Sequence, residues 1–253
     1  MNKNPEIFME ETIPKIGLYL FAIPWIVIGI QHYIYADFVA SLVPSFIGEK
    51  IFWVYLTGTG MIAAGISFIA NIKVPLSAML LAIMLMIFIL LIHIPILVGH
   101  PLAINWTRAI QDTALTGVAL MLTGSVKLIN TGRLLYAVCL ALLGFQHFGH
   151  VSFITAKVPS YFPLINLCDY CIGTLMICAA IGIIIKQRLL LAGALSGILI
   201  GLFALLNNVP LLIENVHNGQ QWTGLMLDIA LTAGAFITLK KVPAMHNDIC
   251  IVL

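Results

Sequence analysis

Two aspartates and an arginine stand inside stretches of the chain that are otherwise apolar. Asp112 and Asp228 each interrupt a long apolar run, and Arg108 precedes Asp112 by four residues. An ionised carboxylate in a lipid-like interior is costly unless it is paired or protonated. Arg108 shares a helical face with Asp112, so the spacing predicts an ion pair. The position that corresponds to Arg108 near Asp228 is Gly224, and we therefore expect His147 to be the partner of Asp228.

Histidines accompany these carboxylates and add groups that donate hydrogen bonds and carry protons. His32 and His147 each follow a glutamine. His93-Ile94-Pro95 matches Asn208-Val209-Pro210 later in the chain. Both histidine and asparagine form hydrogen bonds, so we expect a hydrogen bond at this position in both copies. Only the histidine of the first copy also titrates near neutral pH. These residues predict either a polar pocket with proton-transfer chemistry or a hydrogen-bonded network that only clamps helices together.

Further residues allow two interpretations each. Trp106 and Trp222 open apolar runs, where tryptophan is typical of a membrane interface but also suits a ligand pocket. Cys168 and Cys171 form a CxxC motif, which predicts either thiol redox chemistry or ordinary packing of small residues. Haem or a metal ion could use His32, His93, His147 or His150, but no helix repeats the paired-histidine spacing of a metal motif, so a metal site is a weaker prediction.

The sequence contains an internal repeat. Gly29-Ile30-Gln31-His32 returns 115 positions later as Gly144-Phe145-Gln146-His147. Trp106 and Asp112 return as Trp222 and Asp228 after a slip of one residue. Residues 1–130 and 131–253 are therefore predicted to be two copies of one unit, with a turn at Asn130-Thr131-Gly132 between them.

The amino-acid composition predicts that the protein is surrounded by membrane lipid. Apolar residues make up 61% of the chain and charged residues 9%, against about 25% charged in soluble domains. The net charge of +2 gives no indication of a nucleic-acid partner. The sequence predicts an all-α polytopic membrane protein with eight transmembrane helices, arranged as two parallel four-helix repeats. The predicted spans are residues 16–35, 51–69, 74–98, 106–126, 134–148, 164–185, 189–213 and 222–239.

Orientation follows from the lysines and arginines. With a cytoplasmic N-terminus, nine of them flank the inner ends of the spans and three flank the outer ends. This bias predicts a protein of the bacterial cytoplasmic membrane with both termini in the cytoplasm. A helical rise of ~1.5 Å per residue then places the histidines, aspartates and Asn208 about 18–30 Å above the inner boundary. Such a common depth is what a shared pocket requires.

A segment with Val-Pro-Ser follows the first span of each unit, at residues 36–50 and 150–163. Proline cannot continue a helix interior, so each segment is predicted to hold a short helix that ends at the proline. This helix would lie over the outer ends of the bundle, either as a simple cover or as a lid above a site.

These features resemble the DoxX-like family of membrane proteins. Gly29, His32, Val43, Pro44, Gly58 and Gly65 carry the resemblance in the first unit, and Gly144, His147, Val158, Pro159 and Gly173 carry it in the second. Family members are usually single four-helix units, so this chain resembles a fused pair. The resemblance implies a link to quinone-dependent sulfur oxidation or to thiol redox systems.

The leading functional hypothesis is a redox component that binds a quinone or a similar lipid-soluble ligand and works with a redox partner protein. In this scheme Asp112 relays a proton, His93 contacts the quinone carbonyl and Arg108 fixes the carboxylate. His32, His147, Asn208 and Asp228 complete the pocket. The alternatives are a non-enzymatic scaffold or assembly subunit and a small-solute transporter.

Overall fold

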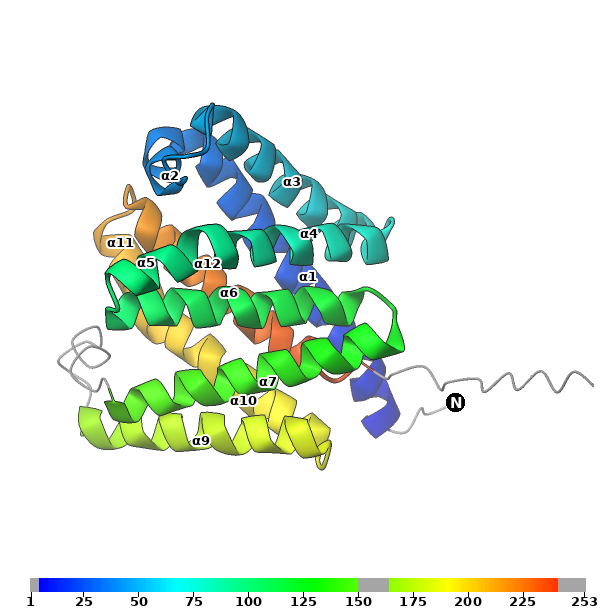
Figure 1. Ribbon diagram of the computed structural model, residues 1–253. Coiled ribbons are helices and arrows are strands. Elements are labelled where there is room, and N and C mark those ends of the chain that lie inside the picture. Colours follow the sequence, from blue (N-terminus) through cyan, green and yellow to red (C-terminus); the bar gives the residue numbers. More distant parts are fainter. Residues whose placement is uncertain (1–4, 150–163, 241–253) are drawn as a thin grey trace, which may run out of the picture.

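The structure, a computed structural model, describes residues 5–149 and 164–240, and every regular element in that part is helical (Figure 1). The first half of the chain forms α1 (Pro5–Ile34), α2 (Ala36–Leu42), α3 (Lys50–Ala70), α4 (Val74–Phe88), the π-helical η1 (Ile89–His93), α5 (Ile94–Gly99) and α6 (Ala103–Leu122). The second half forms α7 (Val126–Gly149), α9 (Ile165–Ile185), α10 (Leu189–Phe203), the π-helical η2 (Ala204–Asn208), α11 (Val209–Glu214) and α12 (Gly219–Ile237).

Irregular backbone recurs at matching places in the two halves. The π-helical segment at Ile89–His93 returns 115 positions later at Ala204–Asn208. Left-handed residues at helix boundaries recur at the same offset, since Asn71 corresponds to Lys186 and Lys73 to Arg188. Left-handed backbone is uncommon outside glycine, so its repetition at equal spacing is a specific similarity.

Helix neighbours also match between the halves. The first helix of each half packs against the second, α1 on α3 and α7 on α9. The last helix of each half crosses to the first helix of the other, so α6 packs on α7 and α12 on α1. Helices α6 and α12 contact each other at the centre, which makes them the shared wall between the halves.

Six of these helical segments are long and apolar enough to cross a membrane by length and composition. They comprise α1, α3, α7, α9 and the two composite segments α4–η1–α5 and α10–η2–α11. The other two predicted spans correspond to the helices α6 and α12, which are long enough but not apolar enough to be counted with these six. Both lie between other helices and bury many small residues, so protein rather than lipid surrounds much of their surface.

The turn predicted between the two halves lies earlier in the chain than expected. Asn130, Thr131 and Gly132 lie inside α7, which begins at Val126 and is longer than the stretch predicted there. The chain reverses at residues 123–125, where Gly124 has φ +82°. Gly132 has a packing role instead, because a Cβ there would collide with the carbonyl oxygen of Gly117 on α6.

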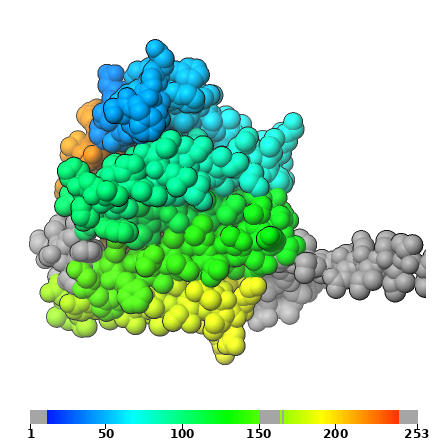
Figure 2. Space-filling model, viewed as in Figure 1, coloured from blue at the N-terminus to red at the C-terminus, as the bar shows by residue number. Residues whose placement is uncertain are grey.

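The short helix predicted after the first span is confirmed as α2, which ends at Leu42 just before Val43-Pro44. In Figure 1, α2, α5 and α11 gather at one end of the bundle, and the α3–α4 and α6–α7 turns lie at the other. The corresponding segment of the second half, residues 150–163, lies outside the described residues. Side chains fill the spaces between the ribbons of α4, α6 and α7 in the space-filling view of the same face (Figure 2).

Close contact between α1 and α3 predicts that a methyl group added at Gly29 will destabilise the protein. A Cβ at this position would lie 2.6 Å from the carbonyl oxygen of Gly58 and 2.7 Å from Ile62 Cγ1. We expect Gly29→Ala to lower the free energy of unfolding by about 1–3 kcal/mol through overpacking. Gly60→Ala is the control, because its nearest neighbour is 3.9 Å away and alanine favours the helix. Melting temperatures in detergent measure both effects, and equal melting temperatures for the two variants would contradict this packing.

Candidate functional site

A cavity of about 820 Å³ lies under α2, between α1, α3, α4–η1–α5 and α6, and reaches the start of α12. Most of its wall is apolar, with Trp25, Phe38, Val54, Met61 and Phe88 among the lining residues. Its polar wall is formed mainly by Gln31, His32, His93, Arg108 and Asp112. An apolar cavity with a few converging polar groups is the usual form of a site for a small organic ligand. The structure thus brings together four of the residues predicted from the sequence.

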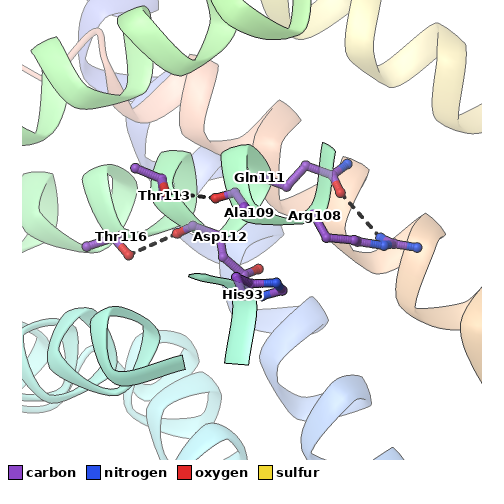
Figure 3. A network of polar contacts seen from close by, with 7 residues as sticks. All are labelled: His93, Arg108, Ala109, Gln111, Asp112, Thr113 and Thr116. Carbon is purple, nitrogen blue, oxygen red and sulfur yellow. Dashed lines mark hydrogen bonds and ion pairs between the residues drawn. The ribbon is translucent and has the colours of Figure 1, made fainter. Parts of the chain in front are cut away.

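His93 and Asp112 are joined by a hydrogen bond at this wall. His93 Nε2 lies 2.8 Å from Asp112 Oδ2, and the two side chains are 18% and 14% exposed. Figure 3 shows the imidazole beside the carboxylate, with the two residues coming from η1 and α6. A carboxylate that holds one ring nitrogen fixes the orientation of the ring, so the other nitrogen has a defined direction.

The π-helical segment η1 determines where His93 stands. His93 is the last residue of η1, and Pro95 follows two residues later in the first turn of α5. Proline has no N–H to give to the turn before it, and π-helical insertions are frequent at functional sites. In the second half, the π-helical segment η2 likewise ends two residues before Pro210. Asn208 is its last residue and therefore occupies the position that His93 has in the first half.

Arg108 does not follow its predicted role as partner of Asp112. Its Nη1 donates to Gln111 Oε1 at 3.3 Å, and Figure 3 shows the side chain extending away from the Asp112 carboxylate. Arg108 instead lines both this cavity and a smaller one in the second half. Position 224 lies beside it, because a Cβ on Gly224 would be in ordinary contact with Arg108 Nη2, at 3.6 Å.

His32 is 7% exposed and lines the large cavity from α1. Its Nδ1 lies 2.8 Å from the backbone carbonyl oxygen of Ile28. A carbonyl only accepts, so Nδ1 carries the proton and Nε2 of the neutral ring is left as an acceptor. His32 therefore offers the opposite hydrogen-bonding character to the cationic Arg108 across the same cavity.

The carboxylate of Asp228 is held by amides rather than by the predicted partner, His147. Asn208 Nδ2 donates to Asp228 Oδ2 at 2.5 Å, and Gln111 Nε2 donates to Asp228 Oδ1 at 3.1 Å. The Asn208–Asp228 pair thus corresponds to the His93–Asp112 pair. Gln111 was not singled out from the sequence, because the residue at the matching position is Leu227 and no repeated motif marks it.

His147 pairs with a residue that sequence reasoning missed. Its Nδ1 lies 2.6 Å from Asp169 Oδ1, and the two side chains are 10% and 5% exposed. Asp169 lies inside the CxxC motif, and the residue at its matching position is Val54. A carboxylate in an apolar helix is itself a signal that could have found this pair.

The smaller cavity of about 130 Å³ lies between α6, α7, α9, α10–η2 and α12. Many of its lining residues are the repeat partners of residues that line the large cavity. Gln146, His147, Met176, Asn208 and Asp228 stand 115 or 116 positions after Gln31, His32, Met61, His93 and Asp112. The two cavities therefore occupy corresponding places in the two halves.

The glutamine of each Gln-His pair connects the halves. Thr107 Oγ1 on α6 donates to Gln146 Oε1 on α7 at 2.9 Å. Thr223 Oγ1 on α12 donates to Gln31 Oε1 on α1 at 3.2 Å. In each repeat the glutamine thus binds the other half, while the histidine faces a cavity of its own half.

The remaining predicted site residues lie away from both cavities. Trp106 is 47% exposed on α6, and Trp222 Nε1 donates to the carbonyl oxygen of Val216 at 2.8 Å. Neither tryptophan is among the residues that line these two cavities. Cys168 is half-buried and Cys171 is exposed, and both lie in the first two turns of α9.

Among residues 5–149 and 164–240, no group of three or more histidine, cysteine, aspartate and glutamate side chains is placed to hold a metal ion. His150, one of the histidines considered as a haem or metal ligand, lies outside the described residues. No protein-family model, curated protein or solved structure matches this chain.

Proposed function

We propose that this protein binds a quinone or a similar lipid-soluble ligand in the large cavity, as the membrane component of a redox system. The observation that supports this most is the placing of the His93–Asp112 pair, His32 and Arg108 on the wall of one largely apolar cavity of about 820 Å³. An apolar ring with carbonyl oxygens needs such a combination of apolar surface, hydrogen-bond donors and a proton carrier.

In this proposal Asp112 orients His93 and exchanges a proton with it, and His93 Nδ1 meets an oxygen of the ligand. Arg108 supplies a fixed positive charge at the wall, which favours an oxygen that gains negative charge. Helix α2 covers the cavity, with Phe38, Val39 and Leu42 among its lining residues. A partner redox protein supplies or removes the electrons.

The proposed setting is a bacterial cytoplasmic membrane, with eight spans in two parallel four-helix repeats and both termini on the cytoplasmic side. The matched left-handed residues, the matched π-helical segments and the reciprocal packing of the last helix of each half support the two repeats. The buried polar layer on α6 and α12 is the expected reason that hydropathy alone finds these two helices less apolar. Membership of the DoxX-like family remains part of this proposal.

Extraction of protein purified in mild detergent, followed by mass spectrometry, tests the proposal. We expect an isoprenoid quinone at a stoichiometry that survives washing in detergent, because the cavity wall is mostly apolar. A protein that co-purifies with phospholipid alone, and that takes up no added quinone, would favour the scaffold hypothesis.

A further inference from the structure

The two cavities lie at corresponding places in the two halves, but they differ in volume and in the polarity of their walls. The large one has about 820 Å³ and the small one about 130 Å³. Ile92 lines the first cavity, and Asn207 lines the second at the matching position. Gln111 also lines the small cavity, and Leu227, which stands at the matching repeat position, lines the large cavity. The second copy is thus too small for a ring with an isoprenoid tail and has a more polar wall.

One buried polar atom without a partner among the described residues lies on the wall of the small cavity, and another belongs to Asp169, the partner of the lining residue His147. Asn207 is 3% exposed, and its Oδ1 has no hydrogen-bond partner within the described part of the chain. Asp169 Oδ2 is buried without one as well. Because Asp169 holds His147 Nδ1, the Nε2 of His147 is the ring nitrogen left for the cavity that this residue lines. Unpaired buried polar groups are costly, and internal water is the usual way in which proteins satisfy them.

We propose that the small cavity is a hydrated chamber, which binds water and protic molecules of similar size. It corresponds to the ligand site of the first half, and in the second half this site holds water instead of the ligand. A volume of 130 Å³ holds about four water molecules at ~30 Å³ each. Polar side chains on the wall can bind this water, and they are those of Thr107, Gln111, Gln146, His147, Asn207 and Asp228. Charged groups face the chamber from three helices besides α7. They are Arg108 on α6, Asp228 on α12 and, through His147, Asp169 on α9.

Arg108 connects the chamber to the large cavity, because it lines both. Water in the chamber therefore reaches a residue of the ligand site without crossing apolar wall. The hydration of the chamber stands independently of what the large cavity binds.

Radiolytic hydroxyl labelling of the full chain, read by mass spectrometry, tests the chamber because radicals form where water is. Met176 is 6% exposed and lines the chamber, whereas Met121 is fully buried and lines neither cavity. We expect oxidation of Met176 to be severalfold faster than that of Met121 in lipid nanodiscs. Asn207→Ile copies Ile92 of the first half and should remove the enhancement at Met176, while labelling of Met61 in the large cavity stays unchanged.

Equal oxidation rates for Met176 and Met121 in the wild-type protein would overturn the proposal, as would an unchanged rate for Met176 in Asn207→Ile. Ordered water in an experimental density map provides a second measurement that does not depend on the variant folding. Neither readout involves a quinone, so a dry chamber and a failure to bind quinone are separate results.

Discussion

His147→Leu is expected to destabilise the protein by about 3–5 kcal/mol, because it leaves the Asp169 carboxylate buried without its imidazole partner. The two side chains are 10% and 5% exposed and lie 2.6 Å apart, so the substitution removes the close partner of a buried carboxylate. The matched variant His32→Leu should cost only about 1 kcal/mol. His32 bonds the carbonyl of Ile28, and Val54 stands where Asp169 stands in the other half.

The double variant His147→Leu/Asp169→Val should recover most of the loss, because it replaces both polar partners with apolar groups and copies Val54 of the first half. Reversible unfolding in mixed detergent, followed by tryptophan fluorescence, measures all three variants. If the two single histidine substitutions cost the same, then the His147–Asp169 pair does not exist as described.

Asp112→Asn is expected to weaken quinone binding by about 10-fold or more, in line with the ~1.5–3 kcal/mol of a hydrogen bond to a charged group. The carboxylate of Asp112 lies 2.8 Å from His93 Nε2 and lines the large cavity, so it fixes the orientation of the imidazole ring. His93→Asn should weaken binding while the fold persists, because Asn208 and Asp228 already form this amide–carboxylate pair in the second half.

Thr113→Val serves as the control for both substitutions. Thr113 follows Asp112 on α6, donates to the carbonyl oxygen of Ala109 and does not line either cavity. Titration of purified protein with a short-chain quinone, followed by calorimetry, gives the dissociation constants. An affinity for Asp112→Asn equal to that of Thr113→Val would exclude Asp112 from the ligand site.

The internal repeat explains why part of the site could be predicted. Since His93 and Asn208 occupy equivalent positions, the sequence indicated that both make the same hydrogen bond, and both bind an aspartate of the last helix of their half. The helical rise placed these groups at one depth. Depth and repetition selected His32, His93 and Asp112, the four-residue spacing to Asp112 added Arg108, and all four line one cavity.

The errors arise where the two halves differ. Asp169 and Gln111 have Val54 and Leu227 at their matching positions, so a search for shared polar residues passes over both. Helical rise gives depth but not the direction of a side chain around the helix axis. His147 and Asp228 were therefore paired by depth, although His147 faces Asp169 on α9 and Asp228 receives amide donors from η2 and α6.

Sterics at the centre of the bundle account for the asymmetry at Arg108. Helices α6 and α12 contact each other, and position 224 lies against the guanidinium of residue 108. Two arginines at these matching positions would compete for one space and repel each other. One half therefore carries Arg108 and the other carries Gly224. In the sequence alone, this difference looks the same as a chance substitution between the two copies.

Filling the large cavity tests the central claim most directly. Thr57 lines the cavity from α3, whereas the adjacent Leu56 is 49% exposed and does not line it. We predict that Thr57→Trp abolishes saturable binding of a short-chain quinone and that Leu56→Trp, with the same added ring, binds like the wild-type protein. Wild-type affinity in a well-folded Thr57→Trp variant would contradict a ligand site in this cavity.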